Sequence, residues 1–195
     1  GVLIYFINHF ASSIRGEYII ARIARDLQSM IAHAPFHAMG NDPAPDFTAP
    51  AFTIEQAQMV KAVQSGYLQK VYYDELLTLA TRYDIVIRIE RSPGVFILAG
   101  SPLATVLDKV VPTQETCEEI QFHFDIGRAR TVEQDLKFLF DKLVETAVRS
   151  LSPAINDPVT AMICLDRLAE GLRALALRPE PSPLRLDGQG SLRLI

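Results

Sequence analysis

Two short polar segments carry the residues whose types and spacing could do chemistry. The first segment covers residues 127–135 and contains Arg128, Arg130, Thr131, Gln134 and Asp135. Two guanidinium groups placed just before a helix could hold a carboxylate or a phosphate in a bidentate fork, and the free amides of the helix N-terminus would add positive potential. This segment therefore favours the binding of an anion or of an acidic segment of a neighbouring chain.

The second polar segment joins two predicted helices over residues 150–158. Its candidate ligand-binding residues are Ser152, Asn156 and Asp157. A short connection makes the two helices antiparallel neighbours, so we expect the two polar segments at opposite ends of the first helix. A purely structural interpretation stays open for both, because Thr131 and Asp157 are suitable helix caps and the acidic residues 115–119 could clamp the two arginines.

Signatures of catalysis and of metal binding are absent from the sequence. None of the motifs GxSxG, GxxxxGK[ST], HExxH or complete GxGxxG occurs. His33 and His37 have the spacing of a metal-binding pair on a helix, but Pro35 interrupts that helix. The two cysteines, at positions 117 and 164, lie far apart and outside any CxxC pattern. We therefore predict no catalytic residue, no metal site and no cofactor.

The composition is that of an ordinary globular protein. The chain has 195 residues, of which 49% are hydrophobic and 22% are charged. Its formal net charge is −4, whereas a nucleic-acid-binding protein would show a basic patch or stripe. We therefore expect no nucleic-acid partner.

Hydrophobic periodicity predicts the helices that must position the polar segments. Apolar residues at steps of three and four predict an amphipathic helix over residues 2–33, close to a heptad seam. A second helix is predicted to open at Thr131, with Gln134 completing a capping box, and a third to open at Asp157 with Pro158 in its first turn. The predicted core stripe of the third helix is Ala161, Leu165, Leu168, Leu172 and Leu175.

Alternating and short apolar runs predict strands between residues 54 and 110. Their rhythm resembles a biotinyl/lipoyl-type barrel-sandwich hairpin, but the tip of the hairpin, residues 92–94, lacks the lysine that a carrier domain needs. Residues 113–122 predict a short acidic helix. The alternative is a strand over residues 120–126, with Phe122 and Phe124 on one face and His123 pointing outward. The last residues, 188–195, have the pattern of the start of a strand.

The expected fold is of the α+β class. It comprises an N-terminal juxtamembrane amphipathic helix, a small barrel-sandwich-like β unit, and a C-terminal antiparallel helix pair with a terminal strand. The predicted organisation is a juxtamembrane helix (1–35), a linker (36–53), the β unit (54–112) and a helical α+β unit (113–195). Both ends of the chain look truncated.

The N-terminal residues raise the question of a membrane. Residues 1–14 are uncharged, too few for a complete span, and are followed by Arg15, Arg22 and Arg25. They fit the inner end of a membrane helix, because positive charge flanks the cytoplasmic end of a span. An amphipathic helix of a soluble protein is the alternative.

Two motifs resemble those of a known family. Arg130-Thr131-x-x-Gln134-Asp135 is followed by Leu151-Ser-Pro-x-x-Asn-Asp-Pro-x-Thr-Ala161. Together they resemble a bacterial family of predicted integral membrane proteins, the domain of unknown function 2254, and the likeness extends over nearly the whole chain. The resemblance implies a soluble C-terminal part of a multi-pass protein of the bacterial inner membrane, with this part on the cytoplasmic side. It implies no reaction, ligand or catalytic residue.

Three functions remain open on this basis. The first is a non-enzymatic regulatory or assembly module of a membrane protein. The second is a ligand- or ion-sensing domain of a transporter or channel-like protein that uses Arg128–Asp135, and the third is an unrecognised enzyme. Because a near-heptad stripe would be left partly exposed on a single chain, we also expect a homo-oligomer that associates through residues 2–31.

Overall fold

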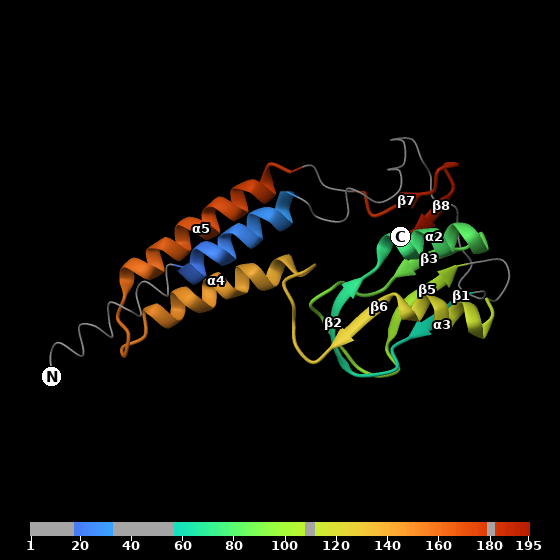
Figure 1. The fold of residues 1–195 in the computed structure, drawn as a ribbon, viewed down its shortest axis with the longest axis horizontal. Coiled ribbons are helices and arrows are strands. Elements are labelled where there is room, and N and C mark those ends of the chain that lie inside the picture. The colour runs from blue at the N-terminus through green and yellow to red at the C-terminus, as the bar shows by residue number, and fades with distance from the viewer. Residues whose placement is uncertain (1–17, 33–56, 108–111, 179–181) are drawn as a thin grey trace. The chain divides into compact units, whose positions relative to one another are not determined.

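The computed structural model describes residues 18–32, 57–107, 112–178 and 182–195. The chain divides into two compact units (Figure 1). The helical unit comprises residues 1–34 and 135–179, and the α+β unit comprises residues 35–134 and 180–195. Each unit is thus assembled from two separate stretches of the chain.

Three helices build the described part of the helical unit. They are the helix over residues 18–32, α4 (Leu136–Ser150) and α5 (Pro158–Ala176). Their shared core contains Ile20, Leu27, Leu139, Leu143 and Cys164, all at most 1% exposed. A Cβ atom on Gly171 would lie 2.6 Å from Cδ2 of Leu27, so glycine at this position lets α5 approach the 18–32 helix closely. The predicted stripe of the N-terminal helix is therefore covered, over residues 20–31, by the same chain.

Two sheets build the α+β unit. The larger has the strand order β1-β5-β3-β8-β7, and the smaller has the order β4-β2-β6. The strands are β1 (Ala57–Lys61), β2 (Gly66–Val71), β3 (Val86–Ile89), β4 (Phe96–Ile97), β5 (Pro102–Leu107), β6 (Phe124–Gly127), β7 (Arg185–Leu186) and β8 (Leu192–Leu194). All pairings are antiparallel except that of β3 with β8, where Ile87 lies beside Leu194. The last strands of the chain thus complete a sheet begun more than a hundred residues earlier.

Two helices accompany these sheets. They are α2 (Tyr73–Tyr83) and α3 (Gln114–Phe122). Leu76 of α2 and Ile120 of α3 join Leu68, Ile87 and Val106 of the strands in one core, all fully buried. β5 is buried along almost its whole length, which explains why its sequence, PLATVL, is apolar without alternation. This core positions the residues that lead into α4.

The α+β class, the N-terminal helix, the C-terminal helix pair and the terminal strand are confirmed. Residues 1–14, where the end of a membrane helix was predicted, lie outside the described residues, as do His33 and His37. None of the described helices is long and apolar enough to cross a membrane.

Three local predictions are wrong. The helix predicted over residues 113–122 is confirmed by α3, but the alternative strand with Phe122 and Phe124 on one face is wrong. Phe122 is the last residue of α3 and is 83% exposed, whereas Phe124 is buried in β6, and His123 between them caps α3. In α5, Leu165 and Leu172 are exposed, and the buried residues are Thr160, Ala161, Cys164 and Gly171. The reason is that α5 carries apolar residues on two sides, so periodicity alone merges two stripes into one. The third error, at the start of α4, concerns the candidate site itself.

Candidate functional site

Residues 128–135, the segment with the two arginines, are tied to strand β2 by side chains. The Gln134 amide accepts a hydrogen bond from the backbone N–H of Val71 (2.9 Å) and donates one to the carbonyl oxygen of the same residue (3.1 Å). Gln69 donates to the carbonyl oxygen of Ala129 at 2.6 Å, and Lys70 lies 3.6 Å from the carboxylate of Glu133. The Gln134 side chain therefore pairs with the backbone of β2 as a neighbouring strand would. It does not complete a capping box.

The helix that follows begins four residues later than predicted. Asp135, which is 4% exposed, is the N-cap of α4, and its carboxylate accepts the backbone N–H of Phe138 at 2.9 Å. Thr131 does not open the helix. Its hydroxyl oxygen is shielded from solvent and has no hydrogen-bond partner within the described part of the chain. The capping prediction failed because Val71 occupies the Gln134 amide.

The two arginines differ in their surroundings. Arg128 is exposed, whereas Arg130 is half-buried and already takes part in an interaction. The predicted acidic partner Glu119 lies elsewhere, since its carboxylate accepts hydrogen bonds from Arg82 (3.3 Å) and from the hydroxyl of Tyr83 (2.7 Å). The bond to Glu119 raises the pKa of Tyr83 above its ordinary value. The acidic residue that could have clamped the arginines thus joins α3 to α2.

The connection between α4 and α5 is also used by the fold. The Asp157 carboxylate accepts the backbone N–H of Thr160 (3.1 Å) and the hydroxyl of the same residue (2.7 Å), with Pro158 opening α5 as predicted. Asn156 has φ of 48°, a left-handed conformation that asparagine tolerates better than most residues. Its backbone N–H donates to the carbonyl oxygen of Ser152 at 2.8 Å. The segment is a closed turn that sets the start of α5.

The structure does not bring the two candidate segments together along α4. Asp135 precedes the first residue of α4, and Ser152 follows its last turn. The fifteen residues of α4 that separate them span about 22 Å at the helical rise of 1.5 Å per residue. Asp135 therefore cannot share a ligand of ordinary size with Ser152, Asn156 or Asp157.

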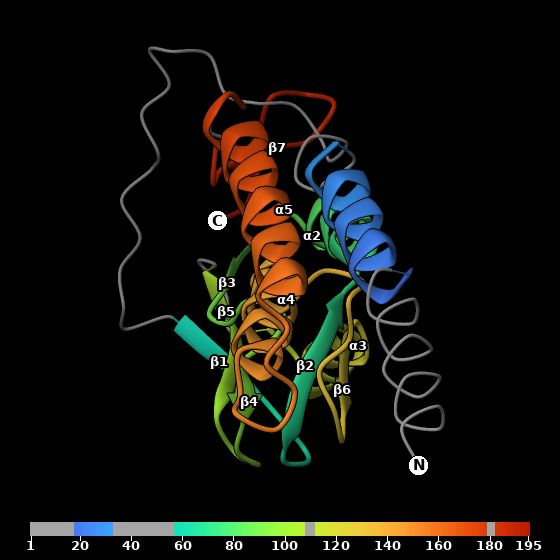
Figure 2. The ribbon, with the colours of Figure 1, turned by 90° about the vertical axis from the view of Figure 1, so that its left-hand side faces the viewer.

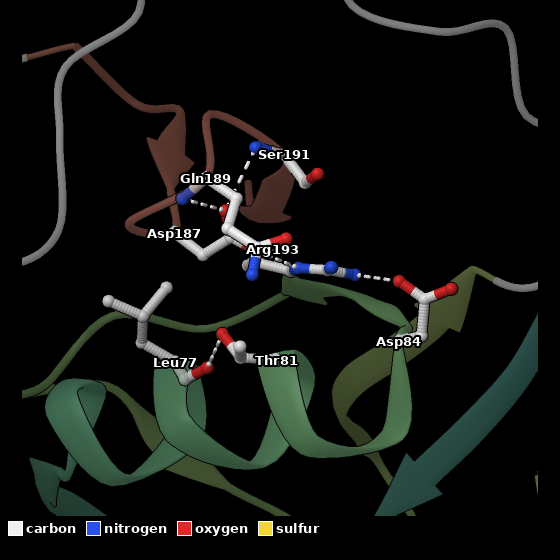
Figure 3. A network of polar contacts seen from close by, with 7 residues as sticks. All are labelled: Leu77, Thr81, Asp84, Asp187, Gln189, Ser191 and Arg193. Atoms are coloured by element: carbon white, nitrogen blue, oxygen red, sulfur yellow. Dashed lines mark hydrogen bonds and ion pairs between the residues drawn. The ribbon is translucent and has the colours of Figure 1, made fainter.

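A buried charge network that the sequence analysis missed lies at the C-terminal hairpin (Figure 3). Nε of Arg193 donates to Asp187 at 2.7 Å, and Nη1 of Arg193 lies 2.7 Å from the carboxylate of Asp84. The other oxygen of Asp187 accepts the backbone N–H groups of Gln189 and Ser191, both at 2.9 Å. Asp84 ends α2 in a left-handed conformation with φ of 55°. The network fastens the β7–β8 hairpin to the end of α2.

The electrostatics of this network are those of a closed structural ion pair. Burial of Asp187 opposes its ionisation, but the hydrogen bonds from Arg193 and from two backbone N–H groups outweigh burial and lower the pKa of Asp187. Burial likewise disfavours the charge of Arg193, yet its two aspartate partners raise the pKa of the guanidinium. The only local signal was the alternation of Leu192, Arg193 and Leu194, because Asp84 is distant in the sequence.

The hollows in the described part of the α+β unit include one beside β3 and one between α2 and α3. One, of about 270 Å³, is lined by Tyr73, Glu90, Arg91 and Arg185 among others. The second, of about 470 Å³, is an open depression between α2 and α3, where Asp74, Glu119 and His123 lie and which does not include Ser152. Glu119 in this depression is already held by Arg82 and Tyr83. Within the described residues, no group of three or more His, Cys, Asp or Glu side chains could hold a metal ion.

The chain is similar to a known protein family and to uncharacterized bacterial proteins. A family model described as "Predicted membrane protein (DUF2254)" matches residues 1–195. An uncharacterized protein of Mycobacterium tuberculosis (strain ATCC 25618 / H37Rv) is 28% identical over 194 residues, and so is an uncharacterized protein of Mycobacterium bovis. The match covers 97% of this chain and 37% of each relative, so the chain spans little more than a third of their length. No solved structure matches the chain.

Proposed function

Because the chain belongs to the family of predicted membrane proteins DUF2254, we propose that it is an extramembrane, non-enzymatic assembly module of a longer membrane protein, on the cytoplasmic side of a bacterial inner membrane. The family and the length of the relatives support the proposal that the chain is part of a longer membrane protein. The arginines at positions 22 and 25, on the N-terminal helix, support the orientation, since positive charge favours the cytoplasmic side.

One observation carries the assembly role. Two polar residues of the family motifs, Asp135 and Asp157, cap the helices of the pair, while the outer side of that pair is apolar. Seven of the large apolar side chains of α4 and α5 are between 39% and 66% exposed. They are Val144, Val148, Val159, Met162, Leu165, Leu172 and Leu175. A contiguous apolar surface of this kind marks an interaction site. The motifs thus cap two helices whose exposed apolar side chains present a contact surface.

The test is whether this surface is covered in the longer protein in its own membrane. Cysteine is introduced at Leu172, on the apolar side of α5, and in a matched control at Arg167, on the charged side of the same helix. The native Cys117 and Cys164 are buried and should react slowly. A hydrophilic maleimide applied to opened membrane vesicles should label the control and leave position 172 protected. Equal labelling of both positions would contradict the proposal.

The sensing alternative is supported by one observation, the exposed Arg128 next to the start of α4. A sensor of anions should be stabilised against heat by its ligand, and the Arg128→Gln variant should lose that stabilisation. We expect no change in melting temperature for either protein with millimolar phosphate, sulfate or nucleotide. A rise that disappears in the variant would replace the assembly module by a sensor.

A further inference from the structure

Helix α5 carries a second apolar stripe that no described residue covers. The stripe, here called the outer seam, consists of Met162, Leu165, Ala169, Leu172 and Ala176. Its steps of three, four, three and four residues are those of a coiled-coil heptad repeat. Met162, Leu165 and Leu172 are 64%, 60% and 55% exposed. An exposed heptad seam on a helix that is already packed on its other side indicates a second helical partner.

The outer seam continues onto α4. Val144 and Val148 of α4 and its C-cap residue Leu151 are 47%, 66% and 57% exposed. Successive residues of a helix are about 100° apart around its axis. In both helices the exposed apolar stripe therefore lies roughly 110–120° clockwise of the buried face, when each helix is viewed from its own N-terminus. Because α4 and α5 run antiparallel, the same sense of rotation brings both stripes to one side of the pair. They form a single apolar face.

The third helix of the unit lies on the other side of this pair. Gln28 donates a hydrogen bond to Glu170 of α5, and Glu170 lies about a third of a turn from the middle of the outer seam. Figure 2 shows the 18–32 helix on one side of α5. Residues 18–32 of the N-terminal helix therefore do not cover the apolar face.

Charges at the edge of the outer seam indicate what covers it. Asp166 and Arg173 directly follow Leu165 and Leu172, so both lie on the same edge, two turns apart. Both are exposed, and neither makes an ion pair with the residues that the structure describes. When two copies of one helix pair antiparallel about a two-fold axis, this edge of one copy meets the same edge of the other. With the axis near Ala169, Asp166 of each copy lies opposite Arg173 of the other.

We propose that the outer seam of α5 pairs antiparallel with α5 of a second copy of this chain, about a two-fold axis near Ala169. The inference rests on the proposed assembly function and names its partner. A parallel pair would place Asp166 opposite the edge that carries Leu168 and Leu175, which offers no opposite charge. Charge at the edges of a coiled coil sets the orientation of the partner, so the pattern selects the antiparallel arrangement.

The size of the face suits a pair of identical helices. Ala169 at the centre is small and lets two helices approach closely, while Leu165 and Leu172 lie on either side of it. Each partner buries about 800 Å² in a standard interface, so the outer seam and the stripe of α4 contribute to the contact together. The interface joins two helix pairs, so α4 flanks the contact on each side.

The first experiment exchanges the charges in the 195-residue chain. Asp166→Arg alone and Arg173→Asp alone each create two repulsive pairs in the dimer, and each should weaken it on the order of tenfold by sedimentation equilibrium at low salt. The double variant Asp166→Arg with Arg173→Asp restores both pairs and should recover the dimer. A monomeric wild type at 100 µM, or a double variant no tighter than the single ones, would overturn the proposal.

The second experiment maps the axis. Ala169→Cys places two thiols next to the two-fold axis, so a short bis-maleimide should convert this variant into covalent dimers. The matched control Arg167→Cys, on the charged side of α5, should remain largely uncrosslinked. Equal crosslinking of both variants, or none of the Ala169→Cys variant, would overturn the antiparallel pairing.

The two proposals can fail separately. If position 172 is protected in the longer protein but the chain neither dimerises nor crosslinks at position 169, another part of the protein or the lipid surface covers the face. That result overturns the pairing and leaves the assembly function standing. If position 172 is freely labelled in the membrane, the assembly function itself is wrong.

Discussion

The α+β unit and the helical unit differ in whether their unusual residues are buried or exposed. In the α+β unit, the unusual residues are buried charges, and Arg193 is held by Asp187 and Asp84 within the same chain. In the helical unit, the unusual residues are exposed and apolar, and they recur at heptad spacing on α5. Burying a charge is costly unless it is paired, whereas a monomer tolerates an exposed apolar stripe until a partner arrives.

This difference shows where to look for a function in the chain. Charged and polar residues drew attention in the sequence because their types could bind or catalyse, but most of them are engaged in caps, turns and strand pairing. The stripe of Met162, Leu165 and Leu172 on α5 is exposed and apolar, and no described residue covers it. The experiments that follow separate residues that hold a unit together from residues that face a partner.

The largest loss of stability is expected for Arg193→Ala. Removing the guanidinium leaves Asp187, which is 5% exposed, as a buried charge without its partner, and this costs about 3 kcal/mol. The measurement is urea unfolding followed by tyrosine fluorescence. Asp84→Asn is the matched control, because the Asp84 side chain is 87% exposed and its ion pair should contribute less than about 1 kcal/mol. Equal losses for both variants would show that the network is not anchored at Asp187.

A loss of about 2 kcal/mol is expected for Gln134→Ala, since both the N–H and the carbonyl of Val71 lose their side-chain partner. Gln134→Met keeps the length of the side chain but removes both the donor and the acceptor, so it should cost nearly as much as the alanine variant. Both are compared by thermal unfolding. If the two variants match the wild type, the amide does not fasten this segment to β2.

A smaller loss, about 1 kcal/mol, is expected for Asp157→Ala, which removes the N-cap of α5. Asp157→Asn keeps a capping oxygen and should stay within a few tenths of a kcal/mol of the wild type. Circular dichroism during chemical denaturation gives both values. A loss well above 2 kcal/mol would mean that Asp157 does more than cap, and no loss would remove the capping role.

The smallest expected effect is a dependence of the stability on acidic pH, which comes from the carboxylate of Asp187. Because its pKa is lowered in the folded chain, its contribution to stability is complete above the ordinary aspartate pKa of about 3.9. That contribution is lost as the pH falls through the lower pKa of the folded state. The stability difference between the wild type and Asp187→Asn should therefore shrink between pH 6 and pH 3, as seen from urea midpoints. A constant difference would place the Asp187 pKa at its unfolded value.

Local signals carried the correct predictions. Asp157 followed by Pro158 is a cap and a first-turn proline, and both roles depend on neighbouring residues only. The terminal strand was likewise visible in the alternation of residues 192–194. Helix caps and strand alternation are short-range features, so one sequence is enough to see them.

Long-range contacts explain what the sequence did not reveal. Gln134 fitted a capping box by spacing, yet its partner Val71 lies 63 residues away. The partners of Arg193 come from its own hairpin and from the end of α2, and no local pattern points to Asp84. On α5, buried and exposed apolar residues interleave at helical spacing, so the pattern predicted one stripe where the fold uses two.

The central claim is that the outer seam of α5 serves a partner and not the fold. The most direct test is the double variant Leu165→Glu with Leu172→Glu, measured by sedimentation equilibrium and by urea unfolding on the same sample. We predict a monomer whose unfolding free energy at low protein concentration equals that of the wild type within about 0.5 kcal/mol, as for exposed positions. Leu139→Ala, in the core of the same unit, should instead lose about 3 kcal/mol. An unchanged mass for the double variant, or a loss of stability as large as that of Leu139→Ala, would contradict the account.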